Sequence, residues 1–127
     1  ISRVQAGQSL LEGQRYKTYV LFSLGINDAI AGTNVSTWKA ATIAHFSNLR
    51  TYLGSNTPIV MTQFQGMGGG DGTGYDSYSN AISEIADEIE NVYCVPATGA
   101  GLRDANHWNY SGMKLIAGRM LDIVEGL

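Results

Sequence analysis

Residues 18–28, Thr-Tyr-Val-Leu-Phe-Ser-Leu-Gly-Ile-Asn-Asp, constrain the fold more than any other part of the chain. The first seven form an apolar run of β-branched and aromatic side chains with little alternation, which is typical of a strand buried on both faces in a parallel sheet. Such a strand needs helices on both sides of the sheet. Asn27 and Asp28 follow Gly25 at the carboxyl end of the strand, where open α/β sheets bind ligands. Gly, Asn and Asp are also ordinary turn residues, so a simple strand-to-loop turn is an alternative.

The rest of the chain alternates apolar runs with amphipathic stretches. Strands are predicted at residues 57–64 and 91–95, a strand tail at 1–4, a turn at 5–9, a short helix around residues 10–15, and longer helices at 36–53, 76–90 and 111–125. The last helix is expected to turn Met113, Ile116, Ala117, Met120, Leu121 and Val124 inward. This alternation indicates a parallel sheet covered on both faces, with right-handed crossovers.

The loops that follow the three strands, residues 25–34, 65–75 and 96–110, are expected to converge at one edge of this sheet. Any functional site should lie there. The glycine-rich segment 66–74 has neither a lysine nor a Gly-Lys-Ser/Thr ending, so it is not predicted to bind phosphate. It is expected to be either a mobile loop beside a substrate or a plain flexible connection.

The composition fits one domain, residues 1–127, because 44% of the residues are hydrophobic and only 15% are charged. A net charge of −3, without any run of Lys or Arg, argues against nucleic acid and anionic membranes as partners. The single cysteine, Cys94, excludes an internal disulfide and a multi-cysteine metal site, and leaves the compartment undecided. Because Cys94 lies in an apolar run, we expect a buried and inert thiol.

Two histidines are candidates for chemistry, and their surroundings differ. His45 lies in the middle of a predicted helix and is expected to pack or to face solvent. His107 follows Asp104 by three residues at the start of the last helix, a spacing at which a carboxylate can hold the imidazole Nδ1–H and leave Nε2 to accept a proton. The alternative is that Asp104 caps a turn and His107 is an exposed cap residue.

The segments Gly25-Ile-Asn27-Asp28 and Asp104-Ala-Asn-His107-Trp108, separated by about 80 residues, together resemble the SGNH, or GDSL-type, hydrolases, a family of esterases and lipases. The resemblance covers the whole chain and implies a flavodoxin-like three-layer fold. It also implies that the Asn27 side chain donates to the oxyanion, and that His107 and Asp104 are the base and acid of a Ser-His-Asp triad. The segment around Gly7, Val-Gln-Ala-Gly-Gln-Ser, is similar to the family block whose Gly N–H completes the oxyanion hole.

Ester hydrolysis needs such a set of groups, and each oxyanion donor contributes about 3 to 4 kcal/mol in kcat. The stretch that begins at Tyr110 is similar to carbohydrate O-acetyl esterases of the family. The expected substrate is therefore an acetyl or other short-acyl ester, carried by a carbohydrate or another small molecule, with no metal or organic cofactor. Gly25, Trp108 and Tyr75 are candidate substrate-binding residues; the two aromatic side chains could stack on a sugar, although buried packing is equally plausible for Trp108.

The first block of the family, a strand that ends in Gly-Asp-Ser and carries the nucleophile, is missing from this sequence. Ser9 is the only substitute, since some related carbohydrate esterases have Gly-Gln-Ser-Asn in this block, but it precedes the next strand too closely and is expected to be a helix cap or surface residue. In a flavodoxin-like sheet the missing strand is central, and its absence would expose an apolar edge, which natural proteins avoid. We therefore expect a companion N-terminal segment or second chain to supply the strand and its serine. The alternatives are a rearranged site that uses Ser9 and a degenerate domain without catalysis.

Two functions from other classes compete with the esterase. One is a carbohydrate-binding or structural module, such as part of a viral fibre or surface assembly, that kept the fold and lost the nucleophile; an extracellular or surface-associated location is favoured. The other, a flavodoxin-like signalling or cofactor-binding domain, is the weaker hypothesis because no phosphate-binding motif or cluster of acidic residues accompanies the strand ends.

Overall fold

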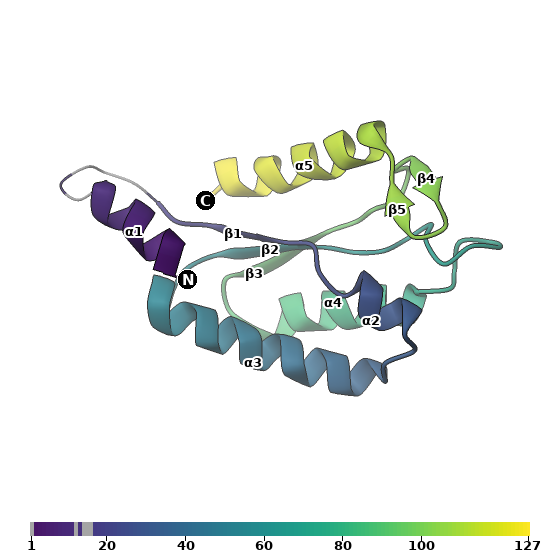
Figure 1. Cartoon of the computed structure of the whole chain (residues 1–127), viewed down its shortest axis with the longest axis horizontal. Coiled ribbons are helices and arrows are strands. Elements are labelled where there is room, and N and C mark those ends of the chain that lie inside the picture. The colour runs from purple at the N-terminus through teal and green to yellow at the C-terminus, as the bar shows by residue number, and fades with distance from the viewer. Residues whose placement is uncertain (1, 12, 14–16) are drawn as a thin grey trace.

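The structure is a computed structural model that describes residues 2–11, 13 and 17–127. Its elements in chain order are α1 (Ser2–Leu10), β1 (Val20–Phe22), α2 (Ile26–Ile30), α3 (Val35–Leu53), β2 (Ile59–Thr62), α4 (Asp76–Glu88), β3 (Val92–Val95), β4 (Leu102–Asp104), β5 (His107–Trp108) and α5 (Tyr110–Glu125). Helix α5 covers one face of the sheet, while α2, α3 and α4 lie on the other (Figure 1). The predicted α/β fold, three-layered and flavodoxin-like, is confirmed.

The main sheet contains three parallel strands in the order β1-β2-β3. In its register Val20 pairs with Ile59, and Ile59 pairs with Val92. All four residues of β2 are buried, because this strand has neighbours on both sides and helices on both faces. The three predicted strands are therefore present, each with shorter bounds than the apolar run that predicted it.

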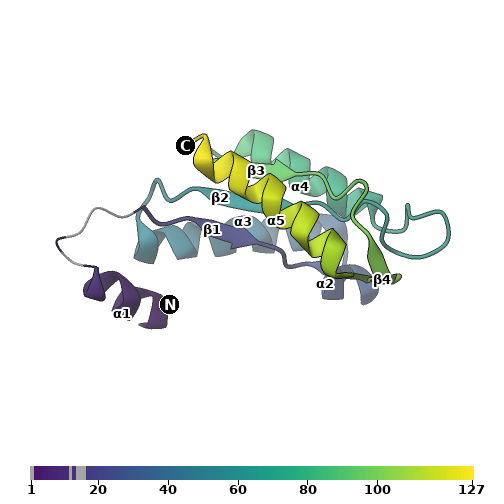
Figure 2. The same cartoon turned by 90° about the horizontal axis from the view of Figure 1, so that it is seen from above.

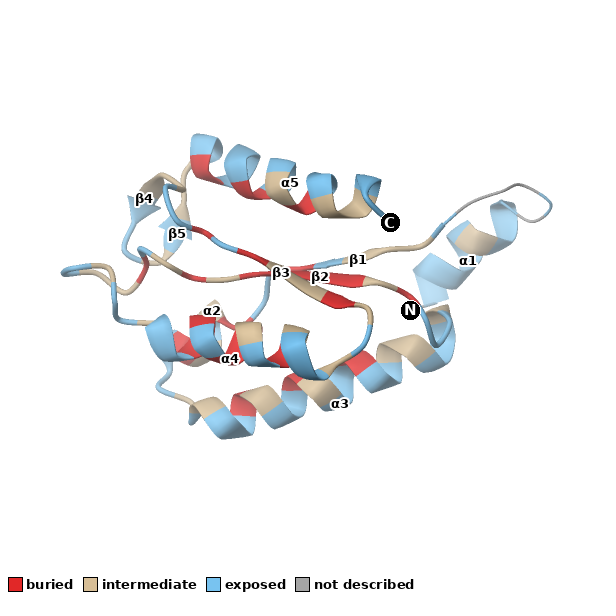
Figure 3. Cartoon of the chain, turned by 180° about the vertical axis from the view of Figure 1, so that it is seen from behind, coloured by how far each residue is buried: buried red, intermediate tan, exposed pale blue. Residues whose placement is uncertain are grey.

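The core is divided between the two faces of the sheet (Figure 3). The larger part lies under α3 and α4, where Phe22 meets Phe46 edge-on at a centroid distance of 4.9 Å. The smaller part lies under α5 and contains Val60, Val95, Ala97, Ile116 and Met120. Only one long helix, α5, therefore covers this face of the sheet, whereas two long helices, α3 and α4, cover the other face.

This unequal cover corrects part of the prediction for the last helix. Ile116 and Met120 are buried as expected, but Met113, Ala117 and Leu121 are exposed. Helix α5 packs on β2 and β3, and its side toward β1 borders an open hollow whose lining includes Leu21, Leu121 and residues of α1. The apolar stripe is present, but only half of it is covered.

Helix boundaries follow from caps. The side chain of Asn34 caps α3 by accepting hydrogen bonds from the amides of Ser36 and Thr37, at 3.0 and 3.3 Å. Gly54 is the C-cap, so the helix ends at Leu53, the predicted residue. Helix α4 follows Tyr75 without a side-chain cap and ends at Glu88, two residues earlier than expected.

The N-terminal prediction is wrong for the described residues. Residues 2–10 form helix α1 rather than a strand tail and a turn. The expected helix around residues 10–15 lies largely outside the described part, which excludes positions 1, 12 and 14–16. No described strand pairs with this segment, and a helix satisfies its own backbone groups locally. Helix α1 stands apart from the layers and buries none of its residues (Figure 2). A hydrogen bond from Gln8 Nε2 to Thr18 Oγ1, 3.1 Å long, ties it to the segment before β1.

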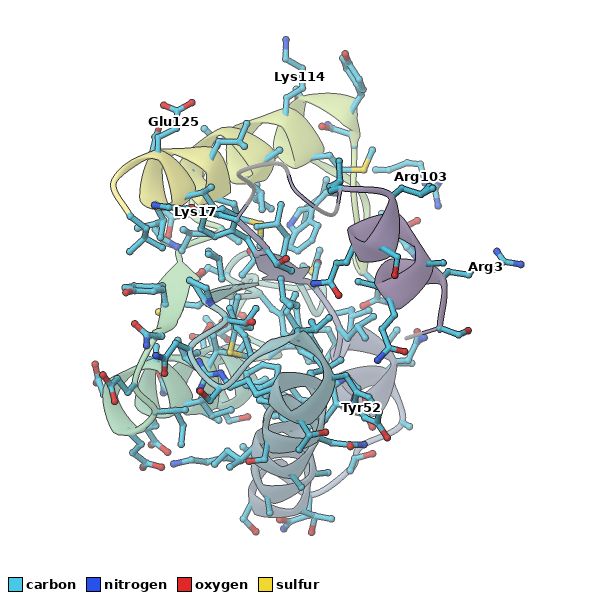
Figure 4. All side chains as sticks on the ribbon, turned by 90° about the vertical axis from the view of Figure 1, so that its left-hand side faces the viewer. Arg3, Lys17, Tyr52, Arg103, Lys114 and Glu125 are labelled. Atoms are coloured by element: carbon cyan, nitrogen blue, oxygen red, sulfur yellow. The ribbon has the colours of Figure 1, made fainter. Side chains whose placement is uncertain are left out.

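Charged side chains are scattered over the surface. Arg3, at the right-hand side in α1, and Lys114, at the top in α5, both project away from the molecule (Figure 4). No helix in the described part of the chain combines the length and the hydropathy needed to cross a bilayer.

Candidate active site

A small antiparallel hairpin, β4 and β5, carries the predicted acid and base. Asp104 ends β4 and His107 begins β5, so the two residues pair across a turn made by Ala105 and Asn106. The sequence predicted only a loop over this region. The hairpin lies at the same end of the sheet as the loops that follow β1 and β2 (Figure 1), as expected for parallel strands.

Asp104 and His107 are joined as the spacing predicted. The distance from Asp104 Oδ1 to His107 Nδ1 is 2.7 Å, and the same oxygen accepts the backbone N–H of Asn106 at 2.9 Å. The Asn106 amide, followed by the His107 imidazole, lowers the pKa of Asp104, so this carboxyl is ionised at neutral pH. A carboxylate only accepts hydrogen bonds, so Nδ1 of His107 must carry the proton, and Nε2 of the neutral ring is then the acceptor. Within the described residues no group hydrogen-bonds Nε2.

A pocket of about 210 Å³ opens beside His107. Its lining consists of Ser23, Ile26, Phe64, Met67, Asn106, His107, Trp108 and Met113. Most of these side chains are apolar, and they come from the segments that follow β1 and β2, including the start of α2, from the hairpin and from the start of α5. The loop after the first strand and the Asp-x-x-His turn thus share one pocket.

Asn27 lies next to this pocket, in the first turn of α2. Its neighbour Ile26 lines the pocket, whereas the exposed Asn27 side chain does not. Gly25 precedes α2 with φ of +120°, and a Cβ at this position would lie 2.7 to 2.9 Å from the Trp38 indole. The structure therefore places Gly25 at a tight turn against Trp38, and Gly25 is not part of the lining of the pocket beside His107.

The structure does not bring Gly7 or Ser9 to His107. Both lie in the exposed helix α1, at the opposite end of the sheet from the hairpin (Figure 1). The Ser9 hydroxyl donates to the carbonyl of Gln5 at 3.1 Å, a local bond within the helix. The expected oxyanion role of Gly7 and the alternative nucleophile Ser9 have no support from this arrangement, because α1 does not pack at the carboxyl end of the strands.

Tyr75 and Trp108 both reach the site, in different ways. The Tyr75 hydroxyl donates to Asn106 Oδ1 at 3.0 Å, so it is bonded to the hairpin. Trp108 is half-buried, packs near Phe64 with ring centroids 6.5 Å apart, and also lines the pocket. Its buried Nε1–H has no hydrogen-bond partner in the described part of the chain.

Sequence reasoning missed Ser23 as a pocket residue. Side chains on a strand alternate between faces, so Ser23 shares the α5 side of the sheet with Leu21. If this alternation had been extended to the end of β1, the sequence could have predicted the Ser23 hydroxyl near the Asp-x-x-His turn. No hydrogen bond joins Ser23 to His107.

The other reactive side chains are not part of the site. His45 is an exposed residue of α3 whose ring lies 6.2 Å from that of Phe22, in agreement with a packing or surface role. Cys94 is half-buried, and this burial raises the pKa of its thiol. Over residues 2–11, 13 and 17–127, no group of three or more His, Cys, Asp or Glu side chains could hold a metal ion.

Neither a family model nor a curated protein matches this sequence. The structure is similar to that of a protein from Arabidopsis thaliana determined by X-ray crystallography at 1.6 Å resolution, with a TM-score of 0.66 and 24% sequence identity. The match covers 92% of this chain and 49% of the other, so the chain spans about half the length of that structure. At this identity the likeness shows the three-layer fold, and function has to be argued from the site.

Proposed function

We propose that this chain forms the larger part of a serine esterase of the SGNH type, which hydrolyses acetyl or other short-acyl esters of a carbohydrate or a similar small molecule. The observation that carries the proposal is the Asp104–His107 pair, whose Nε2 is available beside a pocket shared with the end of β1. A base oriented by an acid, next to a concave apolar pocket, is the arrangement that acyl transfer needs.

In the proposed reaction His107 Nε2 takes the proton of a serine hydroxyl while the serine oxygen attacks the ester carbonyl carbon. Asp104 stabilises the imidazolium that forms, and the Asn27 carboxamide donates to the developing oxyanion. His107 then gives the proton to the alcohol that leaves, and an acyl-serine ester remains. Water, activated by the same imidazole, hydrolyses this ester and restores the serine.

The proposed nucleophile comes from a companion segment or a second chain that adds a strand to β1. Val20 N–H donates to the carbonyl of Pro58 beside β2, so in this parallel strand the amide and carbonyl of Leu21 face away from β2. No described strand pairs with that edge, and Leu21 and Leu24 beside it are 52% and 64% exposed. Long apolar edges are sites of strand addition.

The pocket volume fits a small acyl group. An apolar cavity of about 150 Å³ is large enough to bind benzene. The pocket beside His107, at about 210 Å³, therefore has room for an acetyl or short-acyl chain.

The test uses the native complex isolated through a tag on this chain, with p-nitrophenyl acetate turnover and fluorophosphonate labelling. We expect turnover and a labelled serine on the companion polypeptide, and His107→Ala should lower kcat by about 10³-fold or more without unfolding the domain. His45→Ala is the matched control and should have no effect. Unchanged turnover in His107→Ala would refute the role of the imidazole.

The position of the label separates the remaining alternatives. A label on Ser23 would show that the nucleophile lies within this chain, and a label on Ser9 would require a rearranged N-terminal segment. Absence of both label and turnover, with a companion present, would favour the carbohydrate-binding or structural module.

A further inference from the structure

We propose that the loop over residues 65–75 is a brace that holds His107 in its working orientation, with Tyr75 as a positioning residue. The link to catalysis depends on the proposed esterase function. The brace itself is a statement about this chain alone and can be tested without any substrate.

The loop is closed on itself by backbone contacts that only glycine permits. The Gly66 amide donates to the Gly72 carbonyl at 3.2 Å, and a Cβ on Gly68, where φ is +95°, would lie 2.7 Å from the Cα of Gly74. Asp71 Oδ1 accepts from the amide and hydroxyl of Thr73 at 3.1 and 2.6 Å. The glycines thus allow one defined loop shape. The sequence indicated a mobile or flexible loop and did not predict this shape.

The loop is also anchored to the core. The Met67 side chain is only 2% exposed and belongs to the larger core cluster together with Phe64. At its other end the loop leads directly into α4, whose first residue is Asp76. These two attachments give the loop a fixed position relative to the sheet.

From this position the loop bonds both residues between the acid and the base. The Gly68 amide donates to the Ala105 carbonyl at 2.8 Å, and the Tyr75 hydroxyl donates to Asn106 Oδ1 at 3.0 Å. The backbone N–H of Asn106 donates to the Asp104 oxygen that also binds His107. Three hydrogen bonds, joined through the covalent structure of Asn106 between its side chain and its backbone, therefore connect Tyr75 to the imidazole.

The hairpin needs such external support. Its strands contain three and two residues, and Arg103, Asp104, Ala105 and His107 are exposed. An isolated two-stranded hairpin is at best marginally stable in water. The Asp104–His107 bond alone is also weak, because both partners are exposed.

The experiment is NMR spectroscopy of the imidazole nitrogens of His107 in the full chain at neutral pH, where the nitrogen shifts report the tautomer. We expect one dominant Nδ1–H tautomer in the wild type, and a mixture of both tautomers in Tyr75→Phe and in Asn106→Ala. A matched control should leave the spectrum unchanged: Tyr52→Phe, which removes an exposed hydroxyl from α3, outside the loop. A tautomer ratio in Tyr75→Phe equal to that of Tyr52→Phe would overturn the proposal.

Kinetics of the native complex then separate this inference from the esterase proposal. If both hold, Tyr75→Phe should lower kcat by about tenfold to a hundredfold with KM nearly unchanged, since misplacement of a base weakens transition-state stabilisation. A change in tautomers with no esterase activity in the wild type would leave the brace standing and refute the proposed function. Esterase activity in the wild type together with unchanged tautomers in Tyr75→Phe would support the proposed function and refute the brace.

Discussion

At the scale of single residues, the site depends on positions where the backbone packs closely against its neighbours. Gly25 lets the chain turn from β1 into α2 over the face of Trp38, and this turn brings Ile26 to the pocket and Asn27 beside it. Asp104 stays ionised because the amide of Asn106 and the imidazole of His107 lower its pKa. The chemistry of the pair therefore rests on the local backbone as much as on the two side chains.

The first prediction concerns Gly25. In Gly25→Ala the backbone would be held at φ of +120° and the new methyl group would collide with the Trp38 indole, so we expect the free energy of unfolding to fall by about 2 kcal/mol or more. Gly118→Ala is the control: no atom lies within 4 Å of a Cβ built at this position inside α5, and alanine should stabilise the helix by about 0.5 to 1 kcal/mol. Urea denaturation of both variants measures the difference. Equal stabilities would show that the turn at Gly25 can relax.

At the scale of elements, the start of α5 connects the hairpin to the rest of the fold. Asn109 caps α5 by accepting the amide of Gly112 at 2.9 Å, and its amide nitrogen donates to the Leu102 carbonyl of β4 at 3.3 Å. Gly112 lies so close to Gly101 that a Cβ would collide with the Gly101 carbonyl oxygen. The helix cap and the hairpin are thus parts of one packed unit.

The second prediction compares two helix caps. Asn109→Ala and Asn34→Ala should each lower the free energy of unfolding by about 1 kcal/mol, because each removes an N-cap acceptor. Only Asn109→Ala should also speed amide hydrogen exchange in residues 102–108, because only Asn109 bonds to β4. Similar exchange in this segment for both variants would contradict the coupling between α5 and the hairpin.

The elements that the sequence predicted correctly are those with long, continuous signals. The apolar runs at 18–24, 57–64 and 91–95 each contain a strand, and the helix predicted at 36–53 corresponds to α3. The hairpin could not be predicted in this way, because strands of two and three residues have no measurable periodicity. Helix α1 was missed because the segment has little amphipathic pattern and packs against little of the described fold.

The candidate site was predictable where its signal was local. The spacing of Asp104 and His107 gave their hydrogen bond, since a turn brings residues three apart together. The bond between Tyr75 and Asn106, and the place of Ser23 in the pocket, join segments far apart in the chain, which no local pattern records. The inward orientation predicted for Met113 and Leu121 was wrong for a similar reason: a stripe does not show how much of it is covered.

At the scale of the whole molecule, the two faces of the sheet are covered unequally. The larger core cluster lies under two long helices, whereas the face under α5 leaves the region next to β1 open, with Leu21 and Leu121 exposed. The chain covers 49% of the matched Arabidopsis thaliana structure, so that protein contains chain with no counterpart here. The open edge is where we propose that a companion strand binds.

The third prediction follows from this open edge. The isolated chain should self-associate with increasing concentration, and Leu21→Lys should reduce the association, because a charge on an edge strand disfavours added strands. Leu10→Lys, which changes a side chain of α1 that is 84% exposed, is the control and should have little effect. Sedimentation velocity over a range of concentrations measures the change. A strictly monomeric wild-type chain would argue that the edge is already protected.

The buried indole N–H of Trp108, which has no partner among the described residues, lies in a side chain that lines the pocket. A buried donor left without an acceptor costs about 1 to 3 kcal/mol, so any carbonyl oxygen that reaches it would be bound more tightly for that reason. The chain has two tryptophans, and Trp38 is buried under Gly25, so Trp38→Phe would leave one emitter at the site. Trp108 would then serve as an intrinsic fluorescent probe, with which a titration could follow the arrival of an ester or a companion strand without any added label.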